Sequence, residues 1–386
     1  MNTFDINSRL TKLRKRMKAE KVDAFIVLKS VNVEYLTGFD YIRDNSDPHA
    51  VLITQKEARF ITDARYLEVA QKQAATAAAA AKASHKALWQ VDDPEGRPII
   101  ADLHELWNFK HFKIVALEDK VSYRIFDSIK TSIHPAKVVP AQHWVEDIRS
   151  VKDAAEIDRI KAAQAITDKT FTHLCDFIKP GMTEKEIALE LEYTVQKLGA
   201  EGTSFSPIVA SGPNGSLPHA VPTDRAIKTG DLLTIDFGAS YGGYCSDMTR
   251  TVFIGGTNEA GEPVLPTDEQ RTIYETVLAA QEASLAAFKE GITGIMVDKA
   301  GRKVIEDAGY GDYFVHGTGH GVGLYIHEAP NASPRSPEKL KAGEVVTCEP
   351  GIYLPGKMGV RIEDMVIVTA DGSENITTSP KNLIVI

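Results

Sequence analysis

The sequence predicts two domains, an α/β domain over residues 1–145 and an α+β domain over residues 146–386 that contains an internal pseudo-two-fold repeat. Three observations support this prediction. At 386 residues, the chain is longer than one ordinary hydrophobic core accommodates. Its first part alternates short strand and helix patterns, as an α/β unit does. In the second part, KPGMT at residues 179–183 recurs as KEGIT at residues 289–293, an offset of 110 residues that indicates a duplicated half.

The composition is that of a globular protein, with 43% hydrophobic and 25% charged residues. Acidic residues outnumber basic residues by 53 to 44, so the net charge is -9 and there is no basic footprint for nucleic acid. No segment approaches the roughly 20 apolar residues of a membrane-spanning helix, and no secretory signal is recognisable. Three scattered cysteines, Cys175, Cys245 and Cys348, fit a reducing compartment. We therefore expect a cytoplasmic protein without a nucleic-acid or membrane partner.

The elements of the first domain follow from hydrophobic spacing. Leu10, Leu13 and Met17 are spaced for one face of a helix, and DAFIVLKS has the composition of a strand. The segment AVLITQKEARFITD predicts two short strands around a turn. An alanine-rich helix is expected over residues 74–83, and KIVALED predicts a further strand.

In the second domain, each proposed half opens with helices. Apolar residues recur at helical spacing from about Val145 until Pro180-Gly181, which ends the first helix. The next helix begins with Thr183 and Glu186 at the spacing of a capping box and ends at Gly199. Under the offset of 110 residues, three positions of this helix have counterparts in the second half: Gly199 matches Gly309, Ile187 matches Val297, and Val195 matches Ile305.

The segment LLTIDFGASYGGYCSDMTRTVFI predicts a β-hairpin, because two β-rich runs flank Gly242-Gly243, a dipeptide suited to a tight turn. With these glycines as the loop, Tyr241 pairs with Tyr244, and Asp236 pairs with Thr249. The register alone is uncertain by one residue, and a shift would move every side chain to the other face.

This register places Asp236 and Asp247 on one face of the hairpin. Gly238, opposite Asp247, would leave space above the sheet. Two carboxylates without an interleaved cation repel each other unless a metal ion lies between them. The alternative is that one of the two is simply solvated.

The segment FVHGTGHGVGLYIHEAP at residues 314–330 contains three histidines and four glycines. A phosphate cradle would open a helix, but no helical periodicity follows, so that interpretation is weak. A mobile loop is the simplest alternative. The glycines favour close approach of the backbone to a metal ion and a peptide substrate.

Two further acids, Glu349 and Glu363, occur downstream in strand-like settings. A glutamate in an apolar strand is seldom buried without a partner. For Glu363, an ordinary ion pair with Arg361 is the simplest alternative. Together with Asp236, Asp247 and one imidazole, the glutamates would form an oxygen-rich site for two divalent ions, which favours Mn²⁺ over structural zinc.

Five motifs, taken in chain order, resemble those of the pita-bread metallopeptidase family, in its proline-directed branch of aminopeptidase P and prolidase. They are SLPHA, IDFGASYGGYCSDMTRT, HGTGHGVGLYIHEAP, EPGIY and VRIED. The resemblance implies a pita-bread catalytic domain over residues 146–386. Through NVEYLTGF and FITDARY, it extends to a creatinase-like N-terminal domain over residues 1–145.

The resemblance implies a two-metal centre and assigns five ligands to it. Asp247 and Glu363 would serve both ions, Asp236 would serve one, and His320 with Glu349 would serve the other. Glu349 would also act as the base.

The same resemblance assigns four further residues. His219 and His327 would be catalytic groups that donate to the oxyanion or the amide region. His316 would contact the substrate. Arg361 would hold a ligand carboxylate with two hydrogen bonds.

The implied activity is that of an Xaa-Pro aminopeptidase, in which a hydroxide bridging two divalent ions attacks the bond between an N-terminal residue and a following proline. Mn²⁺ is favoured as the ion over Co²⁺ or Zn²⁺. The implied partners are a proline-containing peptide substrate and a second copy of the chain, as a homodimer. The alternative is an Xaa-Pro dipeptidase, or prolidase. The aminopeptidase is favoured because no clamp for a dipeptide carboxylate is obvious in the sequence.

Three other functions fit the motifs less well. A creatinase-like hydrolase works without metal, whereas all five ligand positions are intact here. A methionine aminopeptidase usually lacks the N-terminal α/β domain, and a non-catalytic peptide-binding module would have lost ligands. Two residues depart from the family pattern: Tyr325, which is expected to alter the substrate pocket, and Cys348, which is expected to face the core beside Glu349.

Overall fold

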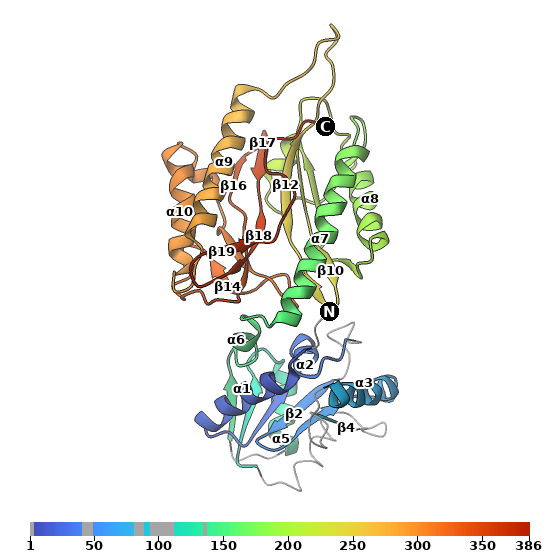
Figure 1. The fold of residues 1–386 in the computed structure, drawn as a ribbon, viewed down its shortest axis with the longest axis vertical. Helices are drawn as coiled ribbons and strands as arrows, with labels where there is room; N and C mark the ends of the chain where they lie inside the picture. The colour runs from blue at the N-terminus through green and yellow to red at the C-terminus, as the bar shows by residue number, and fades with distance from the viewer. Residues whose placement is uncertain (1–3, 41–48, 81–88, 93–111, 134–136) are drawn as a thin grey trace. The chain divides into compact units, whose positions relative to one another are not determined.

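The computed structural model describes residues 4–40, 49–80, 89–92, 112–133 and 137–386 (Figure 1). The chain divides into two compact units, Asn2–Arg149 and Ser150–Ile386, and each is considered by itself. None of the helices within the described ranges is long and apolar enough to cross a membrane.

The N-terminal unit is built on a six-stranded mixed sheet with the strand order β4-β3-β2-β1-β5-β6. The pairs β1–β2 and β2–β3 are antiparallel, whereas β1–β5, β5–β6 and β3–β4 are parallel. Its elements are α1 (Ile6–Ala19), β1 (Ala24–Val27), α2 (Ser30–Thr37), β2 (Ala50–Thr54), β3 (Ala58–Ile61), α3 (Leu67–Ala80), β4 (Gln90–Asp92), β5 (Ile114–Glu118), α5 (Tyr123–Ile133), β6 (Lys137–Ala141) and α6 (Glu146–Arg149).

The predicted elements of this unit are present. Leu10, Leu13 and Met17 are buried on one face of α1, and the expected strand pair forms β2 and β3. The alanine-rich helix is part of α3, and residues 81–83 of that prediction lie outside the described residues. The α/β prediction for the first domain is confirmed.

In the second unit, strands lie between two helix pairs, with α7 and α8 drawn in green on one side and α9 and α10 in orange on the other (Figure 1). The strands form four sheets, ordered β12-β9-β8, β11-β10-β7, β14-β13-β15-β18-β19 and β16-β17. The helices are α7 (Ala154–Phe177), α8 (Glu184–Lys197), α9 (Asp268–Ala287) and α10 (Gly294–Asp307), with two 3₁₀ turns at Gly212–Ser216 and Gly311–Tyr313. The strands are β7 (Gly202–Thr203), β8 (Ile208–Ser211), β9 (Leu232–Phe237), β10 (Ala239–Tyr241), β11 (Tyr244–Cys245), β12 (Met248–Phe253), β13 (Gly319–Gly321), β14 (Glu328–Ala332), β15 (Val345–Cys348), β16 (Gly351–Leu354), β17 (Met358–Arg361), β18 (Asp364–Val368) and β19 (Ser373–Asn375).

The predicted repeat is confirmed in the backbone. Helices α8 and α10 start and end at positions separated by the same 110 residues, and α7 and α9 also end at that offset. Thr183 caps α8 and pairs with Ala226, while Thr293 caps α10 and pairs with Lys339. The matched apolar residues are all fully buried: Ile187, Val195, Val297 and Ile305.

The two halves of the repeat differ at the first residue of their second helix. Helix α8 begins with Glu184, whereas α10 begins with Gly294. A Cβ atom added to Gly294 would lie 2.1 Å from the carbonyl oxygen of Asn331 in β14, so only glycine allows this strand to come so close. The start of α8 carries a long acidic side chain instead.

Each helix pair buries its apolar face against a different set of strands. Helices α7 and α8 share a cluster with β8, β9 and β12, which includes Leu174, Leu191 and Ile235. Helix α10 shares another cluster with β15 and β18, which includes Val297 and Cys348. Cys348 is fully buried, as predicted. The first cluster supports β9, which carries Asp236, and the second supports β15 and β18, which lie next to Glu349 and Glu363.

Candidate metal centre

The hairpin of β9 to β12 has the predicted register. Tyr241 pairs with Tyr244, and Asp236 pairs with Thr249. Asp236 and Asp247 are 7% and 4% exposed, so the alternative of a solvated carboxylate is excluded.

Gly238 serves a different purpose from the one expected. A Cβ atom at this position would lie 1.7 Å from the carbonyl oxygen of Ser246 and 2.3 Å from the hydroxyl oxygen of Ser204. The predicted open space is therefore filled by protein. Gly238 is required because the strands approach closely there, and not because it leaves room for a ligand.

His320 lies on β13 and brings its imidazole to the carboxylates. Its Nε2 atom is 3.5 Å from Asp247 Oδ2 and 3.3 Å from Glu349 Oε1. Its Nδ1 atom is 3.1 Å from the carbonyl oxygen of Gly321, which can only accept a hydrogen bond, so Nδ1 donates. This leaves the lone pair of Nε2 directed toward the acids, an arrangement common in metal-binding histidines.

The two glutamates reach the same place from separate strands. The hydroxyl of Thr347 donates to Glu349 Oε1 at 3.1 Å, and the hydroxyl of Thr249 donates to Glu363 Oε2 at 2.7 Å. One atom from each of Asp247, His320 and Glu363 lies within 4.8 Å of the others.

Two buried carboxylate oxygens in this cluster, Asp236 Oδ1 and Glu363 Oε1, have no hydrogen-bond partner within the described part of the chain. A buried anion without a partner is costly, because it has lost its hydration and gained nothing in exchange. A cation bound between the carboxylates would satisfy both oxygens. The donor set of four carboxylates and one imidazole suits a hard or borderline divalent ion, and no cysteine takes part.

The electrostatics of the cluster also favour a bound cation. Burial is the largest cause that raises the pKa of Asp247, Glu363 and Glu349, and the charges of neighbouring carboxylates raise it further. The guanidinium of Arg361 opposes these shifts but brings a single positive charge. At neutral pH, the cluster therefore requires additional cations if its carboxyl groups are to be ionised together.

Arg361 does not hold a carboxylate in the expected way. Its Nη2 contacts Asp236 Oδ2 only, and its remaining nitrogens donate to Tyr353 Oη at 2.7 Å and Thr249 Oγ1 at 3.0 Å. The expected two-oxygen clamp is not formed. The simple alternative of an ion pair with Glu363 is also wrong, because the carboxylate that Arg361 contacts is Asp236.

Tyr353 connects this arginine to the histidine loop. Its hydroxyl oxygen is 2.8 Å from His316 Nε2, while His316 Nδ1 is 2.8 Å from the carbonyl oxygen of Gly317. Since Nδ1 donates to that carbonyl, Nε2 accepts from the tyrosine, whose oxygen in turn accepts from Arg361. Burial raises the pKa of Tyr353 to about 12, so it keeps its proton.

Helix α10 holds the backbone of the histidine loop. Arg302 donates to the carbonyl oxygens of Phe314 at 2.9 Å and His316 at 2.6 Å. Asp298 pairs with Arg302 and accepts from the amide and hydroxyl of Thr318, both at 3.1 Å. The segment between two of the predicted histidines is thereby fixed to a rigid element.

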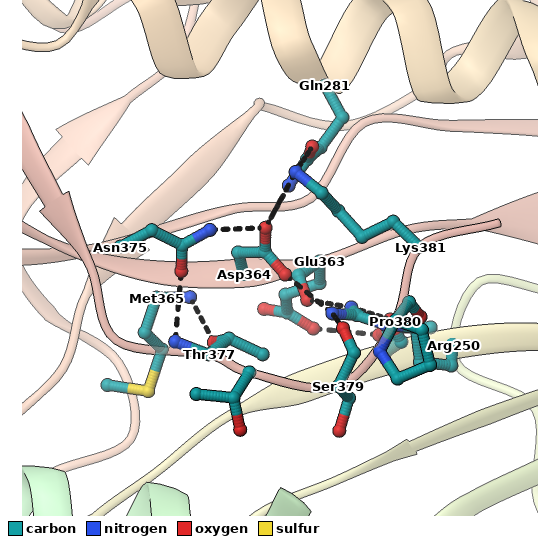
Figure 2. Close-up of polar contacts among 12 residues, drawn as sticks. Arg250, Gln281, Glu363, Asp364, Met365, Asn375, Thr377, Ser379, Pro380 and Lys381 are labelled. Atoms are coloured by element: carbon teal, nitrogen blue, oxygen red, sulfur yellow. Dashed lines mark hydrogen bonds and ion pairs between the residues drawn. The ribbon is translucent and has the colours of Figure 1, made fainter.

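A buried polar cluster anchors Glu363 (Figure 2). Arg250 donates to the carbonyl oxygen of Glu363 and to Asp364 Oδ1, the latter at 2.7 Å. The other oxygen of Asp364 accepts from Gln281 at 2.9 Å and Asn375 at 2.7 Å. The Arg250 and Asp364 side chains are each 1% exposed, so this pair fixes the turn between β17 and β18 from inside the core.

Burial lowers the pKa of His316, His320 and His327 below the ordinary value for histidine. For His327, the neighbouring histidines lower it further, and its ring centroid lies 4.3 Å from that of His320. These imidazoles are therefore neutral at neutral pH, the form in which histidine binds a metal ion or offers one donor and one acceptor.

A cavity of 580 Å³ brings the predicted site residues together. All nine line it: His219, Asp236, Asp247, His316, His320, His327, Glu349, Arg361 and Glu363. Tyr325, which was expected to shape the pocket, is not among the lining residues.

The cavity also contains residues that the sequence analysis missed. Arg335 and Asn331 follow the histidine motif and line the wall, together with Phe205 and Ile208. Tyr353 lies within the EPGIY motif, so its proximity to Glu349 was a usable signal. Arg335 had no such signal, because an isolated arginine in a polar segment is usually solvated.

Two family models match the chain. Residues 158–370 match the model of metallopeptidase family M24, and residues 9–151 match the creatinase/prolidase N-terminal domain.

Solved structures and relatives match over nearly the whole chain. The structure of an Xaa-Pro dipeptidase from Bacillus anthracis is 38% identical with a TM-score of 0.89, covering 99% of this chain and 100% of the other. An X-Pro aminopeptidase from Thermotoga maritima is 36% identical with a TM-score of 0.83, covering 96% and 100%. An Xaa-Pro dipeptidase from Pyrococcus furiosus is 34% identical, covering 98% of this chain and 100% of its own.

These matches agree with the creatinase-like and pita-bread domains that the motifs predicted, and they identify the chain as an enzyme of the Xaa-Pro dipeptidase or aminopeptidase type. The chain belongs to metallopeptidase family M24 and carries a creatinase/prolidase N-terminal domain.

Proposed function

We propose that the protein is an Xaa-Pro dipeptidase that works with two divalent ions, Mn²⁺ being the preferred one. The aminopeptidase was favoured from the sequence, but relatives over the full length support the dipeptidase better. Two relatives described above, from Bacillus anthracis and Pyrococcus furiosus, carry that name. The aminopeptidase stays the second candidate, because the Thermotoga maritima structure also covers nearly the whole chain.

The observation that carries the choice is the position of Arg335 in the wall of the cavity that contains the carboxylate cluster. A dipeptide ending in proline has a free carboxylate next to the scissile bond, whereas a longer peptide does not. A guanidinium binds a carboxylate with two parallel hydrogen bonds. Arg335 therefore supplies the clamp whose apparent absence led the sequence analysis to favour the aminopeptidase.

Asp236, Asp247, His320, Glu349 and Glu363 would hold the ions. The two oxygens without partners and the excess negative charge support this assignment. Bound divalent ions supply Lewis acidity toward the scissile carbonyl and lower the pKa of water.

The residues of the chain have separate roles around that chemistry. Glu349 would accept a proton at its carboxylate, because it lines the cavity beside the other acids. His327 and His219 would donate hydrogen bonds to the oxyanion or to the amide region, and His316, held by Tyr353, would contact the substrate. None of these contacts needs an amide hydrogen on the scissile bond, which an Xaa-Pro bond lacks.

The test compares Ala-Pro with Ala-Pro-Ala as substrates for protein that is stripped with a chelator and reloaded with Mn²⁺. A preference for Ala-Pro on the order of 10- to 100-fold in kcat/KM is expected, the value of a charged hydrogen bond to the free carboxylate. Equal or faster cleavage of Ala-Pro-Ala would establish the aminopeptidase instead. The Asp247→Asn variant, prepared in the same way, is the control against a contaminating peptidase. If the Mn²⁺-loaded wild-type protein hydrolyses neither peptide, both candidate functions are rejected.

A further inference from the structure

The carboxylate of Glu184 holds both ends of the loop that carries His219. Glu184 is the first residue of α8, and its side chain is buried with 0% exposure. Its Oε1 accepts from the amide and the hydroxyl of Ser211, both at 2.7 Å. Its Oε2 accepts from the side chain of Asn214 at 2.9 Å and from the amide and hydroxyl of Thr223 at 3.0 and 2.6 Å.

The loop between these anchors forms part of the cavity wall. It passes through a 3₁₀ turn at Gly212–Ser216 and then presents Pro218 and His219 to the cavity. His219 itself is exposed, and no hydrogen bond joins its imidazole to another side chain in the described ranges. The point from which this imidazole enters the cavity is therefore set by the backbone of the loop.

A carboxylate suits this role because it accepts hydrogen bonds at both oxygens and donates none. Burial alone would raise the pKa of Glu184, but the donors of Thr223 and Ser211 hold it below its usual value, so the group is ionised. A glutamine would direct an NH₂ group toward groups that are themselves donors.

The helix does not need this residue for its own formation. In the second half of the repeat, α10 begins with Gly294 at the equivalent position, and the Thr293 hydroxyl accepts from an amide of the first turn, as the Thr183 hydroxyl does in α8. The acidic side chain of Glu184 thus serves the loop and not the helix.

We propose that Glu184 is a positioning residue that fixes the loop of residues 211–223, and through it the imidazole of His219, in the cavity. The kinetic consequence rests on the proposed function, because it takes His219 to act on the bound peptide. Anchoring of the loop does not rest on that function and can be measured without substrate.

The first experiment is hydrogen–deuterium exchange, followed by mass spectrometry of peptides that span residues 211–223. In Glu184→Gln, these peptides should exchange faster by on the order of tenfold, because the loop opens locally. The matched control is Glu186→Gln, two residues along the same helix. Within the described residues its parent carboxylate accepts from Thr183 alone, and its glutamine still completes a capping box. It should exchange like the wild type. Unchanged exchange in Glu184→Gln overturns the proposal.

The second experiment is a double-mutant cycle on the Mn²⁺-loaded protein. Glu184→Gln should lower kcat on the order of 10- to 100-fold with a smaller change in KM, and leave Mn²⁺ binding by calorimetry unchanged. In a His219→Ala background, Glu184→Gln should lower kcat by almost nothing more, because the imidazole that Glu184 positions is absent. Losses that simply add would show a general structural role and overturn the proposal.

Two arrangements keep the result interpretable. If Glu184→Gln does not fold, Asn214→Ala removes one donor, leaves the carboxylate in place, and should show the same cycle with a smaller loss. If the wild-type protein cleaves neither peptide, the proposed function has failed, and the exchange experiment still decides whether Glu184 anchors the loop.

Discussion

Arg361 contacts one oxygen of Asp236 through Nη2, while the other oxygen, Oδ1, has no hydrogen-bond partner within the described residues. The protein thus holds one half of this carboxylate and leaves the other half for a cation. The guanidinium is also a fixed positive charge at the edge of a cluster of four acids.

Arg361→Met should therefore destabilise the metal-free protein strongly. The substitution leaves Asp236 without its counter-charge and removes the donor to Tyr353, so the free energy of unfolding should fall by about 3–5 kcal/mol. With Mn²⁺ present, the loss should be smaller, because bound cations replace part of the missing charge. Urea unfolding with and without Mn²⁺ measures both values. Equal losses in the two states would contradict this account.

Asp247→Asn should abolish metal loading while preserving the fold. The amide keeps the shape of the side chain but removes a charge that the cluster offers to a cation. Mn²⁺ affinity should fall by at least about 100-fold, beyond what loss of an outer partner causes. Titration calorimetry measures the affinity, and circular dichroism checks the fold. Wild-type affinity in this variant would remove Asp247 from the ligand set.

His320 and His327 should give opposite results although their rings are only 4.3 Å apart. His320→Ala should lose Mn²⁺, because this imidazole faces Asp247 and Glu349. His327→Ala should bind Mn²⁺ normally and lose about 10²- to 10⁴-fold in kcat, the usual contribution of a positioned proton donor or acceptor. Metal analysis after gel filtration, together with steady-state kinetics, separates the two. A His327→Ala protein without metal would make this residue a ligand.

The carboxylate cluster and the buried histidines should have opposite effects on the pH dependence of the metal-free protein. The folded-state pKa of Asp247, Glu363 and Glu349 is raised, so their contribution to stability is lost as the pH rises through those values. The pKa of His316, His320 and His327 is lowered, so these groups destabilise the fold as the pH falls below the ordinary histidine value. Glu363→Gln removes part of the first effect and keeps the second, so the wild type should gain stability relative to this variant as the pH falls from neutral. Urea unfolding of both chelated proteins measures the difference, and a relative loss for the wild type on acidification would contradict this account.

Arg335→Ala should affect the dipeptide more than the longer peptide. Loss of a guanidinium–carboxylate contact should raise KM for Ala-Pro about 10- to 100-fold, with little change for Ala-Pro-Ala. Arg335→Lys keeps the charge but loses the planar guanidinium, so its KM for Ala-Pro should lie between those of the wild type and Arg335→Ala. Equal effects on both peptides would assign Arg335 to the structure of the wall and not to substrate choice.

Local signals allowed much of this protein to be predicted. The turn glycines set the hairpin register, and capping residues with apolar spacing located α8 and α10, because these features depend on neighbours in the sequence. The nine candidate site residues were identified because motif resemblance records long-range contacts that spacing does not. Their individual roles are predictions that the variants above test.

Other features depended on contacts that no local pattern encodes. The partner of Arg361 is Asp236, on a strand 125 residues earlier, and its neighbour Glu363 was the natural guess from sequence. Gly238 was expected to leave space, but the close approach of Ser246 decides its identity. The roles proposed for Arg335 and Glu184 depend on contacts across loops, so they could be inferred only from the folded chain.

The contrast between Glu184 and Gly294 bears on how this architecture can be modified. The two halves share helix ends, caps and core positions, yet each should be impaired by the residue that the other half uses at the start of the second helix. A side chain at Gly294 would collide with β14, and a glycine at Glu184 would release the loop of His219. A chimera with two copies of the first half would place a glutamate where β14 needs a glycine. A chimera with two copies of the second half would lack the carboxylate that holds the loop of His219. The same helix position thus supports a different part of the cavity wall in each half, the strand of Asn331 beside Gly294 and the loop of His219 beside Glu184.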